Sequence, residues 1–430
     1  MTASKLLGVS LSLALLAACG ERDEILPGER VDLRETPALV NQSLAVNIPG
    51  AQSNADWSHR NGDTDHLISH PALGGTLREV FATSIGEGDS RRARITAEPV
   101  VAGGVVYTLD ARATVTATTT SGQRVWSRNL TPSRDRPSDA SGGGISVADG
   151  QVYVATGFGE ISALDAASGE TRWVQDLDAP VMSPPTIVGD LAYVVARNST
   201  ALALDTTTGR IQWQVSSNPS TANFSGSAAP AVSDDIAVFP FPSGEVVGTF
   251  PQGGLRRWSV AITGDRLGRA AALVTDITSD PVIDGATVYV GNFGGRVVAL
   301  DANNGDRIWT AAEGAISPVW PVGNALFLIN DINQLVRLDA GNGQPVWRID
   351  LPDTERTGRR RKEVVGHYGP VLAGGRLIVT SSDGFIRQYD PASGNLLGRV
   401  AIARGAASAP VIAGQTLYVV SKNGQLHAFR

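Results

Sequence analysis

Three histidines, His59, His66 and His70, stand close together near the N-terminal end of the chain. Histidine is the commonest metal ligand in proteins, and three of them with a free fourth position would suit a zinc site. No cysteine stands near them, and loop histidines without cysteine are usually solvated. Two interpretations therefore remain open, a zinc site or solvated histidines, and we expect the second, with no metal bound.

Other motifs of catalysis and cofactor binding are absent. The sequence has no Gly-x-x-x-x-Gly-Lys-Ser/Thr loop, no His-Glu-x-x-His and no Asp-x-Asp-x-Asp-Gly calcium loop. No Gly-x-Ser-x-Gly elbow marks a nucleophilic serine. A Ser/His/Asp arrangement assembled by the fold stays open. Apart from that alternative, we expect no catalytic residue, no cofactor and a protein that is not an enzyme.

A run of cations interrupts an acidic chain between residues 353 and 367. It consists of Arg356, Arg359, Arg360, Arg361 and Lys362. The whole chain has 36 basic and 42 acidic residues and a net charge of −6, which provides no general attraction for nucleic acid. The basic loop could dock on an acidic protein surface or on anionic lipid headgroups, or it could be a solvated loop without a partner.

The N-terminus reads as an export signal. Lys5 and the apolar run from Leu6 to Ala18 match the first two regions of a signal peptide, and the run is shorter than the roughly 20 residues of a spanning helix. It ends in Leu16-Ala17-Ala18-Cys19, which resembles the lipobox of bacterial lipoproteins. The resemblance implies cleavage of residues 1–18 and acylation of Cys19 by fatty acids such as palmitate. The alternative is a plain secretory signal beside an incidental thiol.

Cys19 is the only cysteine of the chain, so it cannot form an intramolecular disulfide. Several acyl chains, at about 0.8 kcal/mol per buried CH₂, would anchor the protein stably without spanning the membrane. Residues 19–54 carry mixed charges without a helical or strand period, which is typical of a flexible tether. In such lipoproteins an aspartate after the acylated cysteine signals inner-membrane retention. Gly20 at that position implies the periplasmic face of the outer membrane.

The rest of the chain is built from repeats. A tryptophan closes six units at intervals of 38 to 51 residues, a period that fits propeller blades or pairs of helices. The units consist of short β-branched runs separated by turns with glycine, asparagine and aspartate, and no run has a helical period. The closing tryptophans are Trp126, Trp173, Trp213, Trp258, Trp309 and Trp347, with Leu397 in a seventh place. We expect them to pack between blades.

Closure of the ring predicts the blade number. An aromatic residue or Ile378 opens the second strand of eight units, and the eighth unit ends at Arg430 without a fourth strand. Phe81 lies in the phase of the tryptophans but has no three strands before it. An N-terminal strand around Phe81 should therefore complete the last blade. The predicted fold of residues 55–430 is all-β, an eight-bladed β-propeller of four-stranded antiparallel blades.

The repeat resembles that of pyrroloquinoline-quinone (PQQ) dehydrogenases, over nearly all of residues 76–430. Together with the lipobox and the tether, the eight units resemble the BamB family, lipoproteins of the outer-membrane β-barrel assembly (BAM) complex. The resemblance implies a non-enzymatic scaffold, monomeric within a hetero-complex, that binds the POTRA domains of BamA and other BAM components. It would assist the insertion of β-barrel proteins into the membrane.

The family resemblance also implies where the partner binds. In the family, loops after the third and fourth tryptophan units make the contact, with two leucines and an arginine in the first and two aspartates in the second. Here the matching positions hold Ala222, Phe224 and Ser225 in the first loop, and Asp276 and Thr278 in the second. Phe224 and Asp276 fit the pattern, while the other three depart from it. Arg266 or Arg269 is a candidate to replace the missing arginine, and Phe224 could instead pack in its own blade.

Two alternative functions remain. The first is a membrane-anchored quinone-dependent dehydrogenase, although such enzymes commonly carry a vicinal disulfide that a chain with one cysteine cannot form. The second is a propeller that binds polysaccharide. We expect the scaffold because no catalytic cluster is visible and a propeller offers exposed loops for a partner.

Overall fold

The computed structural model describes residues 39–220, 228–264, 266, 276–357 and 361–430. These residues form strands, turns and coil, and they contain no helix that could cross a membrane. Cys19 and the predicted signal peptide lie outside the described residues, as do most of the predicted tether, Ala222, Phe224, Ser225, Arg269, Arg359 and Arg360.

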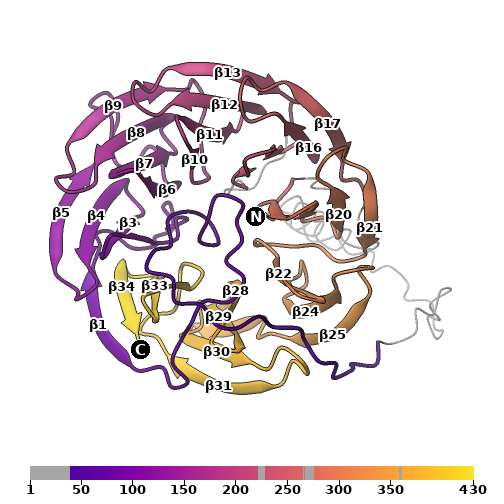
Figure 1. Ribbon diagram of the computed structural model, residues 1–430. Coiled ribbons are helices and arrows are strands. Elements are labelled where there is room, and N and C mark those ends of the chain that lie inside the picture. Colours follow the sequence, from indigo (N-terminus) through magenta and orange to yellow (C-terminus); the bar gives the residue numbers. More distant parts are fainter. Residues whose placement is uncertain (1–38, 221–227, 265, 267–275, 358–360) are drawn as a thin grey trace, which may run out of the picture. The chain divides into compact units, whose positions relative to one another are not determined.

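Eight four-stranded antiparallel sheets surround a central axis and form an eight-bladed propeller, as predicted (Figure 1). Blades 1 to 4 consist of β2 (Val100–Ala102), β3 (Val105–Leu109), β4 (Thr114–Thr119) and β5 (Arg124–Asn129); β6 (Gly143–Ala148), β7 (Gln151–Thr156), β8 (Glu160–Asp165) and β9 (Thr171–Asp176); β10 (Thr186–Val188), β11 (Leu191–Ala196), β12 (Thr200–Asp205) and β13 (Ile211–Ser216); and β14 (Ala231–Val232), β15 (Ala237–Pro240), β16 (Glu245–Thr249) and β17 (Arg256–Ala261). Blades 5 to 8 consist of β18 (Val282–Asp284), β19 (Thr287–Gly291), β20 (Val297–Asp301) and β21 (Arg307–Ala311); β22 (Trp320–Val322), β23 (Ala325–Ile329), β24 (Gln334–Asp339) and β25 (Pro345–Asp350); β28 (His367–Ala373), β29 (Arg376–Ser381), β30 (Phe385–Tyr389) and β31 (Leu396–Ala401); and β32 (Val411–Ala413), β33 (Thr416–Ser421) and β34 (Gln425–Phe429) with β1 (Glu79–Ser84).

The position of a strand within its blade decides its burial. The second strands β11 and β33 are buried along their whole length, because neighbouring blades cover both faces of each sheet. The outermost strands, such as β13 and β31, are largely exposed and keep an alternation of side chains. The sequence therefore shows continuous apolar runs near the axis and mixed runs at the rim.

The recurring tryptophans join consecutive blades, as predicted. A Cβ atom on Gly209 would lie 2.5 Å from the ring of Trp173, and Gly169 meets Trp126 in the same way. The Trp173 Nε1–H also donates a hydrogen bond of 2.8 Å to the carbonyl oxygen of Thr206 in the next blade. Only glycine fits beneath these rings, which explains why tryptophan and glycine recur together.

The N-terminal strand closes the ring. Strand β1 pairs antiparallel with β34, with Phe81 opposite Ala428, so the last blade takes its outer strand from the start of the propeller. The ring of Phe81 lies against Gly122 of blade 1, the place that a tryptophan takes at the other junctions. The predicted strand exchange is confirmed.

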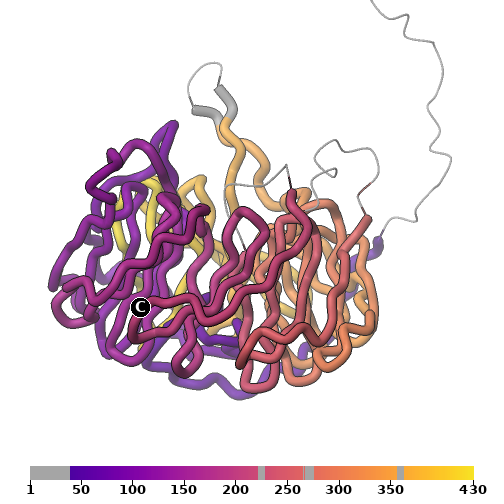
Figure 2. The backbone as a smooth tube through the Cα atoms, turned by 90° about the horizontal axis from the view of Figure 1, so that it is seen from above, coloured from indigo at the N-terminus to yellow at the C-terminus, as the bar shows by residue number. Residues whose placement is uncertain are grey.

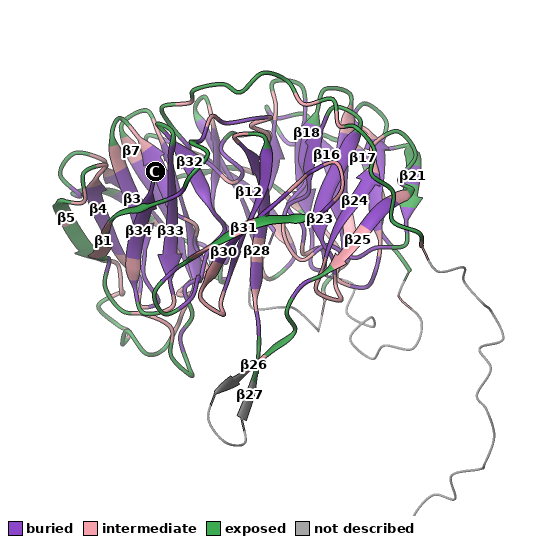
Figure 3. Cartoon of the chain, turned by 90° about the horizontal axis from the view of Figure 1, so that it is seen from below, coloured by how far each residue is buried: buried purple, intermediate pink, exposed green. Residues whose placement is uncertain are grey.

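The connections define two faces of the ring. The turns between first and second strands and between third and fourth strands lie on one face, together with residues 54–71, which we call the plug; this is the plug face. The connections from one blade to the next lie on the opposite face, the loop face. The hairpin of β26 (Thr354–Thr357) and β27 (Arg361–Val364) extends from the loop face (Figures 2 and 3).

Part of the predicted tether is bound to the propeller. The backbone N–H of Gln42 donates to Val346 of β25 at 3.1 Å, and the Asn41 side chain hydrogen bonds the backbone of Arg348. The buried guanidinium of Arg337 donates to the carbonyl oxygens of Leu44 and Ala45. Residues 41–45 therefore lie along the outer edge of blade 6.

Candidate functional site

The plug crosses the axis and contacts every blade (Figure 1). It makes two backbone hydrogen bonds between Trp57 and Val101 of blade 1, and the Trp57 ring stacks on Trp320 of blade 6 at 6.3 Å. The other contacts are hydrogen bonds to the first strand, or to the turn that follows it, of the remaining blades. They join Ser58 to Val147, His59 to Ile187, Thr64 to Val232, Asp65 to Ile283, Pro71 to Gly374 and Asn54 to Gly414.

An ion-pair network lies at the centre of the plug. Arg60 donates to Glu98, before blade 1, at 2.8 Å and to Asp280, before blade 5, at 3.0 Å. Blades 1 and 5 face each other across the ring, so Arg60 bridges its diameter. Burial lowers the pKa of Arg60, but Asp280 and Glu98 raise it above its ordinary value, so the guanidinium stays charged. The cavity beside Arg60 measures about 10 Å³, room for at most about one water molecule.

The three histidines do not form a metal site in the described structure, where no group of three metal-ligating side chains occurs. The prediction that they are solvated is wrong, because all three are buried in or beside the plug. The Nε2 of His59 accepts the N–H of Ile187, while His66 and His70 hydrogen bond the carbonyl oxygens of Pro281 and Pro49. Burial lowers the pKa of His59 to about 3 and that of His66 to about 4, so both are neutral at pH 7.

The second predicted partner loop lies on the loop face, between β17 and β18. Asp276 is buried and has interactions within the chain. Ile277 forms a β-bridge with Asn292, and the Thr278 hydroxyl donates to the carbonyl oxygen of Ala315 at 2.5 Å. The end of this connection is therefore fixed against blades 5 and 6. The partner role of Asp276 and Thr278 stays a prediction.

Arg266 holds the start of the same connection. Its guanidinium binds both carboxylate oxygens of Asp331 at 2.9 Å and also pairs with Glu313 at 3.1 Å. Glu313 in turn accepts a hydrogen bond of 2.6 Å from Arg348 of β25. Because its charge is neutralised inside the chain, Arg266 has less to offer a partner than the sequence suggests.

The predicted basic loop forms the hairpin β26–β27 between blades 6 and 7. Its register places Arg356 opposite Lys362 and Thr357 opposite Arg361, and Glu355 lies opposite Glu363 nearer the ring. Like charges at directly opposed positions destabilise a β-ladder. The hairpin thus concentrates positive charge toward its tip, which favours an anionic partner at this place.

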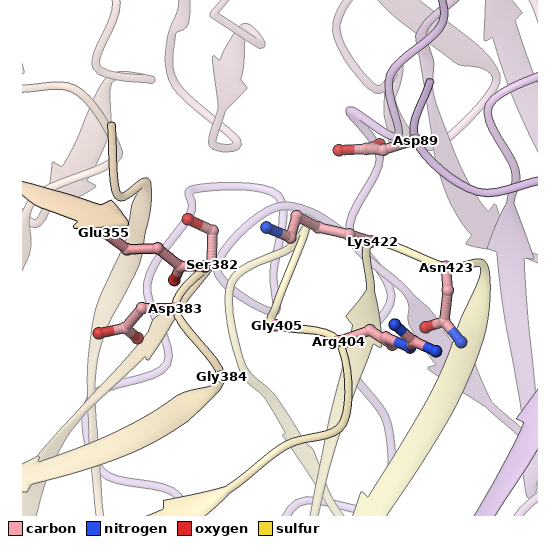
Figure 4. A pocket seen from close by; sticks show the side chains of 9 residues that line it. All are labelled: Asp89, Glu355, Ser382, Asp383, Gly384, Arg404, Gly405, Lys422 and Asn423. Carbon is pink, nitrogen blue, oxygen red and sulfur yellow. The ribbon is translucent and has the colours of Figure 1, made fainter. Parts of the chain in front are cut away.

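A cavity of about 460 Å³ opens at the base of the hairpin, between blades 7 and 8 (Figure 4). Glu355 of β26 belongs to its wall, and Lys422 extends toward Ser382 across it (Figure 4). Its other walls come from Asp89, Asp383, Gly384, Arg404, Gly405 and Asn423. Two of the three acidic residues in the wall, Asp89 and Asp383, are paired with arginines. The remaining charges of the wall are those of Lys422, Arg404 and Glu355, so positive charge is in excess. The cavity, like the hairpin, suits an anionic group.

Sequence reasoning missed the plug and the cavity. The signal for the plug was weak: residues 54–71 contain polar side chains without a period, and their partners lie in every blade. The cavity combines residues from five separate segments of the chain, and no local motif marks it.

Comparison with known proteins gives one family. The family model described as "Outer membrane protein assembly factor BamB" matches residues 111–349 and 336–430 of this chain. The outer membrane protein assembly factor BamB of Shewanella oneidensis is 23% identical over 98% of this chain and 97% of its own. That of Yersinia pestis is 23% identical over 82% of this chain and 88% of its own.

The fold of this chain is shared by solved structures of more than one class of protein. BamB from Moraxella catarrhalis has a TM-score of 0.68 at 17% identity and covers 83% of this chain and 100% of its own. The quinohemoprotein alcohol dehydrogenase of Comamonas testosteroni has a TM-score of 0.65 at 14% identity, over 88% of this chain and 81% of its own. The structural similarity therefore establishes the propeller fold but does not distinguish a scaffold from an enzyme.

Proposed function

The chain belongs to the BamB family of outer membrane protein assembly factors, and from this premise we propose that it is a non-enzymatic scaffold of the BAM complex. The family match over three quarters of the chain carries the proposal. In the proposed function, Cys19 is lipidated and holds the protein at the periplasmic face of the outer membrane. The loop face binds the POTRA domains of BamA, with Phe224, Ser225, Asp276 and Thr278 at the contact.

The hairpin β26–β27 and the cavity at its base extend this proposal. Arg356, Arg361 and Lys362 occupy the strands of the hairpin, and Arg359 and Arg360 belong to the connecting residues. The cavity wall beside the hairpin carries Lys422 and Arg404. The hairpin and the cavity both favour a negatively charged partner. The hairpin therefore docks on an acidic surface of a BAM component or on anionic headgroups.

The filled axis argues against the rival dehydrogenase. The plug occupies the centre of the ring with hydrogen bonds to the blades, and the cavity beside Arg60 is far smaller than a quinone cofactor. A cofactor on the axis would have to displace Arg60 and leave the buried Asp280 without its cation.

Co-purification from detergent-extracted outer membranes tests the proposal. The tagged, lipidated wild type should bring down BamA and other BAM components, whereas Phe224→Glu should lose them. Because Asp276 is buried, the second variant is Asp276→Asn, which removes the charge without adding bulk. Asp190→Asn, at an exposed turn of the plug face, is its matched control and should retain BamA.

The outcomes separate the function from its interface. Absence of BAM components with the wild type would overturn the scaffold function. Retention of BamA by both loop-face variants, with wild-type circular dichroism, would leave the function standing and overturn the assigned contact.

A further inference from the structure

One turn of blade 4 departs from a rule that five other blades follow. In five blades an aspartate opens the turn between third and fourth strands, and its carboxylate accepts backbone N–H groups two or three residues further on. These are Asp165, Asp205, Asp301, Asp339 and Asp390. In blade 4 the same place holds Phe250, whose N–H donates to Leu255 as that of Asp165 donates to Glu170. Phe250 cannot supply the carboxylate, and its side chain is 46% exposed.

The residue that closes this turn is also apolar, where five other blades have a polar one. The other five turns end in an exposed polar residue, namely Glu170, Arg210, Asp306, Gln344 and Asn395. Blade 4 has Leu255, which is 69% exposed. Two apolar side chains thus stand at the two ends of one backbone hydrogen bond, where the repeat otherwise places polar ones. A local rule that is broken twice by exposed apolar residues is typical of a functional surface.

The neighbouring turn of blade 4 is also unusual. Between first and second strands the other seven blades have a glycine, but blade 4 has Asp234-Asp235. Both aspartates are exposed, and neither belongs to an ion pair among the described residues. They line a groove of about 570 Å³ on the plug face together with Phe250, Pro251, Gln252, Arg257 and Asn303.

The cation of the groove is already engaged. The Arg257 guanidinium lies 5.0 Å from the centre of the Phe250 ring and donates to the backbone carbonyl oxygen of Asp235 at 3.1 Å. It therefore covers one face of the ring and leaves the carboxylates of Asp234 and Asp235 free to attract a cation from outside.

We propose that this blade-4 groove binds a protein segment that presents a basic side chain next to an apolar one. The basic group pairs with Asp234 and Asp235, and the apolar side chain packs on the exposed part of Phe250. The groove lies on the face opposite the loops of the proposed function, so it is a second docking surface and does not depend on the BamA contact.

A defined peptide tests the groove on the full-length protein. The probe is a fluorescein-labelled hexapeptide of alternating leucine and lysine, and its binding is followed by fluorescence anisotropy. We expect it to bind at least about tenfold more tightly than the leucine–glutamate peptide, and Asp234→Asn with Asp235→Asn to weaken it about tenfold. The double variant Asp149→Asn with Asp190→Asn, which makes the same charge change in two turns of the same face, should bind within about twofold of wild type.

Phe250→Asp separates the apolar contact from simple charge attraction. It restores the residue found in five other blades, so the fold should tolerate it, and it adds a negative charge to the groove. The proposal expects weaker peptide binding and unchanged co-purification of BAM components. Tighter binding would overturn the apolar half of the proposal. Equal weakening by the control double variant, equal binding of both peptides, or binding of chitotetraose in place of the peptide would overturn the groove as a protein site.

Discussion

The plug face and the loop face of this ring are built from different kinds of connection. On the plug face the turns within a blade are short, and residues 54–71 hydrogen bond the blades through the partly buried Arg60 and the buried His59 and His66. On the loop face longer connections join consecutive blades, and the hairpin β26–β27 extends away from the ring (Figure 3). The polar groups of the plug thus serve the closed ring, while the charged hairpin lies away from it and remains available to a partner.

The largest effect should come from Arg60, at the centre of the plug. Arg60→Leu leaves Asp280, whose side chain is fully buried, and Glu98 without their cation. Removal of one partner of a buried ion pair costs about 3–5 kcal/mol, so the free energy of unfolding in urea should fall by that amount. Arg172→Leu breaks an exposed pair with Asp165 and should cost at most about 1 kcal/mol. Similar losses for the two variants would show that the ion pairs of the plug stabilise the protein no more than an exposed pair does.

A smaller effect should appear as the pH falls. An unfolded chain binds a proton on His66 below about pH 6.5, but burial lowers the folded-state pKa to about 4. The stabilisation is therefore complete above pH 6.5 and is lost as the pH falls toward 4. Between pH 7 and pH 5 this histidine alone should cost about 2 kcal/mol. His59, with a pKa of about 3, adds a loss of the same sign.

His66→Asn isolates the contribution of His66. His66 has a φ of 64°, which asparagine tolerates, and asparagine does not titrate. The unfolding free energy of the variant should therefore fall about 2 kcal/mol less than that of the wild type between pH 7 and pH 5. Burial raises the pKa of Asp65 to about 6, which opposes the histidines in both proteins alike, so the difference between them is the measurement to make. If the unfolding free energies of wild type and variant fell equally between pH 7 and pH 5, protonation of His66 would not contribute to the pH dependence.

The regular part of this fold could be predicted because its signals are local. Trp173 and Gly209 recur at fixed places in each unit since one packs on the other, and Phe81 keeps the same phase. Such contacts repeat along the chain, so the blade number and the closing strand follow from spacing alone. The same repeat makes Phe250 stand out in the sequence, because five other units have an aspartate at this position.

The plug and the partner contacts could not be predicted in the same way. Each residue of the plug meets a different blade, so its contacts leave no period, and His59 looks like any histidine of a polar loop until the ring closes around it. Asp276 illustrates the opposite problem. Its match to the family pattern suggests an accessible charge, but the fold buries the side chain, and burial depends on neighbours that the sequence does not align.

The smallest effect on stability is expected in the hairpin of the loop face, which lies away from the closed ring. Arg356 and Lys362 occupy opposed positions in the register of the ladder, and Lys362→Glu puts opposite charges at these positions in place of like ones. A cross-strand pair contributes about 0.2–1 kcal/mol, so the hairpin itself should become slightly more stable. The global unfolding free energy should not change, because the hairpin extends from the ring.

Binding should change in the opposite direction from stability. Lys362→Glu changes the charge of the hairpin by two units, so association with an acidic partner should weaken, and more so at low salt, where screening is small. Co-purification of BAM components at low and high salt measures the partner, and hydrogen exchange of the β26–β27 amides measures the hairpin. Lys422→Glu makes the same charge change at the cavity and should weaken association without slowing hydrogen exchange in the hairpin. If Lys362→Glu slowed exchange and left association unchanged at both salt concentrations, the positive charge of the hairpin would have no partner, and the hairpin would be as self-contained as the plug.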